Sequence, residues 1–126
     1  MGSHKIDWIS AGASALLTLE FVMHGAAMLT RMEAGLDPIE KHLGFRPGIG
    51  FTTVLGIVDF AVAGAFVIGI KSPAIAFVAS SYSTALFGGL MVIRLRKNLG
   101  TVVYPPDFPI FFGLSVAVLL RNLGRL

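Results

Sequence analysis

The chain has 126 residues, of which 55% are hydrophobic and only 13% are charged. Soluble domains carry about 25% charged residues, so the composition favours one membrane-embedded domain covering residues 1–126. The formal net charge is +3. The basic residues are scattered at predicted helix ends and loops, where they meet lipid headgroups, so we expect no nucleic-acid binding. The absence of cysteine excludes disulfide, thiolate and iron–sulfur chemistry within the chain.

Four apolar stretches follow one another along the chain and predict helices at about 8–30, 49–70, 73–95 and 107–121. A helix needs roughly 20 apolar residues to cross a bilayer. The first three stretches reach that length, and the fourth reaches the lower limit only when it is extended back through Tyr104. The runs are continuous rather than alternating, which argues against membrane strands. The sequence therefore predicts an all-α, polytopic membrane protein with a four-transmembrane-helix antiparallel bundle.

A short polar segment in the first loop carries helix-start signals. Asp37 can cap a helix, Pro38 suits its first position, and Glu40 completes a capping pattern three residues after the cap. Gly44 is a plausible end. We expect a short helix here, lying at the membrane interface.

Ionisable and hydroxyl groups recur near the middle of the apolar stretches. Glu20 and Asp59 each lie inside one of them, at a cost of at least roughly 2.5–3.5 kcal/mol for a membrane-buried acid. His24 follows Glu20 by four residues, so the two share a helical face. The third stretch has Tyr82 within a run of serines and threonine, and the fourth has Ser115. These residues predict a polar layer inside the bundle.

The polar layer supports three interpretations. In the first, the layer only holds the helices together through hydrogen bonds. In the second, Glu20, His24 and Asp59 line a small-molecule site with Tyr82 as a further hydrogen-bond partner, suited to the carbonyls of a quinone or another amphipathic lipid. In the third, a membrane acid alternates between a proton and a cationic substrate, as in a proton-coupled transporter.

Metal and catalytic sites have less support. Glu20, His24 and Asp59 include two carboxylates and an imidazole, a recognised metal-ligand set, but one pair spaced by four residues is weak support for it. Haem coordination by His24 alone is weaker still. The sequence contains no nucleophilic triad, phosphate loop or zinc motif. We therefore expect no metal site and no catalytic residue acting alone.

A short pattern occurs in both of the first two stretches. Glu20-Phe21 is followed by Gly25-Ala26, and Asp59-Phe60 by Gly64-Ala65, with the same spacing. The pattern suggests that the two helices share one packing solution and face the same direction.

Two segments resemble the DoxX-like family of small membrane proteins. Residues 21–29, FVMHGAAML, are similar to the first-helix signature of that family. Residues 56–59, GIVD, together with the glycines that follow them, are similar to its second helix. The tight connection at residues 71–73 and the four-helix layout extend the resemblance over nearly the whole chain. The departures are Met28, where the family usually has lysine, and Asp59, where glutamate is commoner.

The resemblance implies a four-helix bundle and little settled chemistry. Some relatives are subunits of a thiosulfate:quinone oxidoreductase, and others accompany redox or stress-response enzymes. It thus implies a multi-pass protein of the bacterial inner membrane, acting as an accessory or quinone/lipid-interacting subunit of a membrane redox assembly. Its partners would be membrane lipid and either other subunits or further copies of the chain. A quinone is the cofactor that fits best, with haem less favoured.

Overall fold

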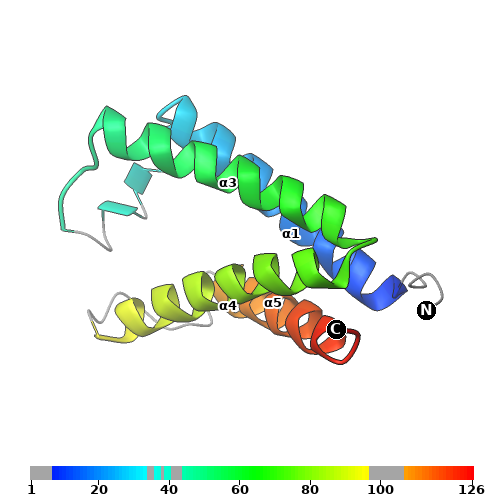
Figure 1. Cartoon of the computed structure of the whole chain (residues 1–126). Helices are drawn as coiled ribbons and strands as arrows, with labels where there is room; N and C mark the ends of the chain where they lie inside the picture. The colour runs from blue at the N-terminus through cyan, green and yellow to red at the C-terminus, as the bar shows by residue number, and fades with distance from the viewer. Residues whose placement is uncertain (1–6, 34–35, 38, 41–43, 97–106) are drawn as a thin grey trace.

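A computed structural model describes residues 7–33, 36–37, 39–40, 44–96 and 107–126 (Figure 1). Within these ranges the chain forms helices and no strand, which confirms the predicted all-helical class. The helices are α1 (Trp8–Leu29), α3 (Ile49–Gly69), α4 (Pro73–Arg96) and α5 (Asp107–Leu123).

The helices run antiparallel to their neighbours and pack in a ring in the order α1, α3, α4, α5 (Figure 1). Contact is most extensive within two pairs, α1 with α3 and α4 with α5. We call the end that holds the start of α1, the turn from α3 to α4 and the end of α5 the terminal end. We call the opposite end the loop end. The ribbons of the two pairs lie close together at the terminal end and diverge toward the loop end (Figure 1).

Three of the described helices are long and apolar enough to cross a membrane: α1, α3 and the Pro73–Ile93 part of α4. The fourth, α5, is apolar but has only 17 residues, or about 25 Å at 1.5 Å per residue. Large apolar side chains are exposed on all four helices, among them Leu16, Val54, Val78 and Ile110. Such surfaces suit lipid rather than water, so the chain is a multi-pass membrane protein.

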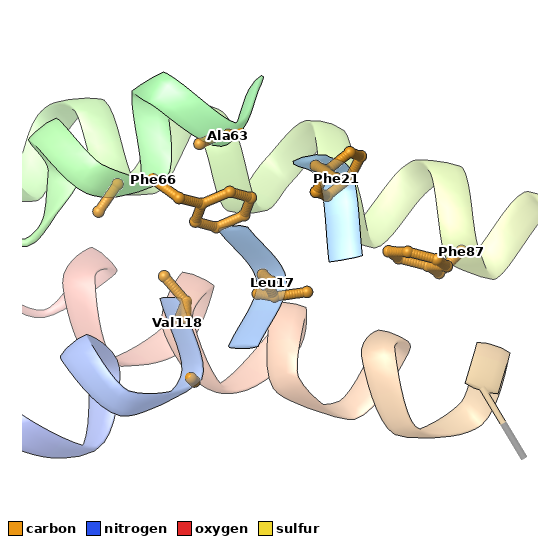
Figure 2. Packing of buried hydrophobic residues seen from close by; sticks show 9 residues of the cluster. Leu17, Phe21, Ala63, Phe66, Phe87 and Val118 are labelled. Atoms are coloured by element: carbon orange, nitrogen blue, oxygen red, sulfur yellow. The ribbon is translucent and has the colours of Figure 1, made fainter. Parts of the chain in front are cut away.

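The core consists of buried apolar side chains from all four helices (Figure 2). Phe21 of α1 lies 6.0 Å from Phe66 of α3 and 5.9 Å from Phe87 of α4, measured between ring centroids. Phe87 in turn stacks on Phe111 of α5 at 5.5 Å. These spacings are those of favourable aromatic pairs. We call Phe66, Phe21, Phe87 and Phe111 the aromatic file, because they connect the four helices in one line of rings.

The α1 and α3 backbones approach closely at Gly25 and Gly56. A Cβ atom on Gly25 would lie 3.1 Å from the Gly56 carbonyl oxygen, and a Cβ on Gly56 would lie 3.1 Å from the Gly25 carbonyl oxygen. These distances are tighter than ordinary Cβ contacts. Small residues at such crossings are typical of membrane helices, whose association depends on close packing.

Arg31 holds the end of α1 against the start of α3. The N–H groups of Arg31 and Met32 turn back to α1 carbonyls, as in a Schellman ending, and Arg31 has the left-handed φ of 53° usually taken by glycine there. Its guanidinium donates to Thr52 Oγ1 at 3.1 Å and to the Pro47 carbonyl at 3.0 Å. The side-chain contacts therefore offset a strained backbone.

At the terminal end, polar residues join α1 to α5. Asp7 caps α1 by accepting from the N–H groups of Ile9 and Ser10 at 3.1 and 3.4 Å, and it also accepts from Arg121 Nε. The Asn122 side chain, fully buried, donates to Ser10 Oγ at 2.8 Å. The Arg121 guanidinium holds the pKa of the Asp7 carboxyl below its usual range. We call Asp7, Ser10, Arg121 and Asn122 the terminal clamp.

The short helix predicted in the first loop lies partly outside the described residues. Leu36, Asp37, Ile39 and Glu40 are helical. Arg46 pairs with the Asp37 carboxylate at 2.9 Å and with the Glu40 carboxylate at 3.0 Å. The location of this segment at the membrane interface stays a prediction.

Candidate functional site

The most distinctive polar contact in the bundle joins His24 of α1 to Asp59 of α3. His24 Nδ1 lies 2.6 Å from Asp59 Oδ2. The Asp59 side chain is 1% exposed, whereas that of His24 is 36% exposed. Gly25 is the chain neighbour of His24, and its close approach to Gly56 brings the two helices near enough for the side chains to meet.

The contact assigns different roles to the two ring nitrogens of His24. An ionised carboxylate only accepts hydrogen bonds, so an ionised Asp59 requires the proton to be on Nδ1. The other nitrogen, Nε2, takes no part in this contact. It accepts a hydrogen bond when the ring is neutral and donates one when the ring is protonated. The buried carboxylate thus orients a partly exposed imidazole, an arrangement found where histidine ligates a metal or exchanges a proton.

Tyr82 approaches the same region from α4, in the other helix pair. Its ring centroid lies 6.5 Å from that of Phe21, which is three residues before His24 on α1. The Tyr82 side chain is 37% exposed. Tyr82 therefore lies near Phe21, about one helical turn before His24.

Glu20 lies one helical turn before His24 on α1 and is half-buried. Helical geometry places it on the same face as His24. Of the four predicted site residues, the structure pairs His24 directly with Asp59. Tyr82 approaches from across the bundle, and Glu20 lies along the helix.

The remaining hydroxyls of the predicted polar layer do not extend the His–Asp contact. Ser83 and Ser115 are 2.5 Å apart and both are fully buried between α4 and α5. The Ser115 hydroxyl donates to the Phe111 carbonyl at 2.7 Å, so Ser83 donates to Ser115. Ser80 donates to backbone carbonyls of its own helix. The hydroxyls of Ser80, Ser83 and Ser115 are therefore satisfied locally, as is common for serine in membrane helices, whereas Thr84 Oγ1 is buried without a hydrogen-bond partner.

Two polar contacts that hold the helices around the site were not predicted from the sequence. Arg31, bonded to Thr52, fixes the α1–α3 pair beyond the site, and Asn122, bonded to Ser10, fixes α1 to α5 at the terminal end. The sequence did mark Arg31 and Asn122 as candidates, because each is a polar residue at the end of an apolar stretch. Their partners were not predictable, because they lie 21 and 112 residues away in the sequence.

In the described part of the chain, histidine and acidic side chains form no group of three or more that could hold a metal ion. The His24–Asp59 contact is thus a two-residue site, suited to hydrogen bonding and proton exchange.

Comparison with protein-family models, with curated proteins and with solved structures finds no match to this chain. Function is therefore argued from the site itself, and the resemblance to DoxX-like proteins stays a prediction.

Proposed function

We propose that this chain is a DoxX-like integral membrane protein that crosses a bacterial inner membrane four times. In this proposal it acts as an accessory, quinone- or lipid-interacting subunit of a membrane redox assembly, and the His24–Asp59 contact binds the ligand's polar head. One observation carries the proposal: a buried carboxylate holds an imidazole that remains more than one-third exposed. That is the arrangement expected of a group that meets a ligand.

The chemistry of the imidazole supports a quinone-type ligand. A quinone carbonyl only accepts hydrogen bonds, and a protonated His24 would donate to it from Nε2. A hydroquinone hydroxyl donates, and a neutral His24 would accept from it. One proton on His24 thus adapts the same site to either form. The hydrogen bond between His24 Nδ1 and Asp59 is kept whether the ligand is the quinone or the hydroquinone.

The surroundings of the site favour an amphipathic ligand over a small polar one. The Phe21 and Phe66 rings lie on the terminal side of the contact, and the Tyr82 ring, with its hydroxyl, lies near Phe21. Ligand pockets typically combine apolar walls with a few fixed polar groups. A ring with an apolar tail matches that composition.

The other two interpretations draw less support from the geometry. A cation transporter needs an acid that is available to its substrate, but Asp59 is almost fully buried and already bonded to His24. A contact that served packing alone would gain nothing from leaving its ionisable ring exposed to this extent.

Binding of a short-tailed benzoquinone to the purified protein in lipid nanodiscs tests the proposal. Replacing His24 with alanine removes a hydrogen bond to the ligand, so we expect affinity to fall about tenfold to a hundredfold. Ser115→Ala, which removes a buried hydrogen bond elsewhere in the bundle, is the matched control and should bind normally. Equal affinity of wild type and His24→Ala would refute the proposed site.

Identification of the molecule that co-purifies with the chain is a second test. Mass spectrometry and an absorption spectrum distinguish quinone, haem and an empty bundle in one preparation. We expect Glu20→Gln combined with Asp59→Asn to abolish quinone or lipid co-purification while the fold is retained. Unchanged retention in that double variant counts against a ligand site. Proton release on adding cationic compounds would instead favour the transporter.

A further inference from the structure

Each helix pair is held together internally. Within α1 and α3, the Gly25–Gly56 crossing and the Arg31–Thr52 hydrogen bond add to the His–Asp contact. Because these contacts are spread along the pair and reach its loop end, α1 and α3 form one unit.

The same is true of α4 and α5. The buried hydroxyls of Ser83 and Ser115 bond to each other, and the Phe87 and Phe111 rings stack at 5.5 Å. Further toward the loop end, a Cβ on Gly88 would lie 3.1 Å from the Phe112 ring. This pair therefore also forms one unit.

The two units are joined firmly at the terminal end. The turn between α3 and α4 is so tight that a Cβ on Gly69 would lie 2.8 Å from the Ala76 Cα atom. On the other side of the ring, the terminal clamp joins α1 to α5 through a buried asparagine–serine bond and an aspartate–arginine pair. The aromatic file crosses between the units near mid-bundle.

The His–Asp contact lies beyond Phe21 and Phe66, toward the loop end. His24 is three residues further along α1 than Phe21, about 4.5 Å closer to the loop end at 1.5 Å per residue. This is the direction in which the ribbons of the two pairs diverge (Figure 1). The exposed part of the contact is therefore in the half of the bundle where the pairs are furthest apart.

We infer that the two helix pairs are arms hinged at the terminal end, and that an amphipathic ligand reaches His24 by inserting between them from the loop end. This inference rests on the proposed function. According to this inference, the ligand enters from the leaflet at the loop end. The separation of the arms controls its access to His24. Hinged motion of rigid units is a common way to open and close a binding site.

Distances between spin labels test the hinge directly, and the natural absence of cysteine allows labels to be placed without background. Val54→Cys with Ile93→Cys reports across the arms at the loop end, and Ile68→Cys with Val78→Cys reports across them at the terminal end. These four side chains are exposed. Met23→Cys with Val54→Cys is the control within one arm.

We expect the cross-arm distance distribution at the loop end to be broader than the other two. Saturation with short-tailed benzoquinone should shift and narrow it, while the terminal-end and within-arm distributions stay unchanged. Three equally narrow distributions would overturn the hinge whether or not quinone binds. A broad loop-end distribution that ignores quinone in protein that binds it would overturn insertion between the arms. If the nanodisc titration detects no quinone binding, the proposed function fails first, and the ligand route fails with it.

Discussion

His24–Asp59 and Ser83–Ser115 are both side-chain contacts between the two helices of one pair, yet they differ in exposure and in charge. Ser83 and Ser115 are fully buried, neutral and hydrogen-bonded to each other or to backbone. In the other contact, Asp59 is equally buried while His24 keeps 36% of its side chain exposed.

A packing contact and a binding site differ in whether a polar group remains available to a ligand. A hydroxyl pair that satisfies itself inside a bundle contributes about 0.6 kcal/mol and has nothing left to offer a ligand. An imidazole oriented by a buried acid keeps one nitrogen available and changes role with one proton. The contact between α1 and α3 therefore has the properties of a site, and the contact between α4 and α5 has those of a packing interaction.

The largest expected effect comes from preventing the helix approach on which the His–Asp contact depends. In Gly25→Val, the new side chain meets the Gly56 carbonyl and the Asp59 Cβ, both 3.1 Å from the added Cβ. We expect a loss of about 3 kcal/mol in unfolding free energy, because backbone cannot move aside as a side-chain tip can. Titration with denaturing detergent measures it. Gly12→Ala, whose Cβ meets nothing within 4 Å, is the control, and an equal loss there would contradict the explanation.

The next effect separates the two contacts by their coupling energies. Double-mutant cycles compare His24→Ala and Asp59→Ala with Ser83→Ala and Ser115→Ala. We expect a coupling of about 2 kcal/mol for the first pair, the size typical of a hydrogen bond with a charged partner, and about 0.6 kcal/mol for the second. A serine coupling as large as the histidine coupling would remove the energetic distinction between them.

Arg31 allows a finer test of how the α1–α3 pair is fixed beyond the site. Arg31→Ala and Arg31→Gly both lose the bonds to Thr52 and Pro47, but only glycine adopts a φ of 53° without steric cost. We expect the alanine variant to be less stable than the glycine variant by about 1 kcal/mol. Thermal unfolding in detergent measures the difference. Equal stability would mean that the end of α1 rearranges once the guanidinium is gone.

The smallest effect concerns pH at the terminal clamp. Because Arg121 lowers the pKa of Asp7 in the folded protein, the contribution of this contact is complete above the ordinary aspartate pKa of about 3.9. It is lost as pH falls below that value and through the folded pKa. Arg121 is 43% exposed, so screening keeps the loss under about 1 kcal/mol. Asp7→Asn should flatten this part of the stability profile, and an unchanged acid dependence would contradict the role of the pair.

The helices were predictable from sequence because each is a long apolar run, and length alone distinguishes such a run from a strand. The inward faces were not. The repeated acid–Phe–Gly–Ala pattern suggested one packing solution for two helices, but Gly25 packs against Gly56 while Gly64 meets nothing within 4 Å. An acid and a glycine five residues apart differ by about 140° around a helix. In α1 the glycine of the pattern, Gly25, faces inward, whereas in α3 the acid, Asp59, faces inward. Contacts with the neighbouring helices determine which of the two residues is buried.

The candidate site was predictable in its members and not in its pairing. Burial cost singled out Glu20 and Asp59, and helical spacing added His24. His24 and Asp59 lie 35 residues apart in sequence. They meet because the crossing of Gly25 and Gly56 brings the two helices together at this level. The hydroxyls were expected in the same layer, but serine satisfies itself on its own helix or on its neighbour.

The most direct test of the binding site is the ¹⁵N magnetic resonance signal of the His24 ring during titration with short-tailed benzoquinone in nanodiscs. The chain has three histidines, so His24→Gln assigns the signal. We predict a saturable change at Nε2, with the Nδ1 proton still bonded to Asp59. Saturable quinone binding that leaves Nε2 unchanged, or no binding at all, would contradict the assignment of His24–Asp59 as the ligand site.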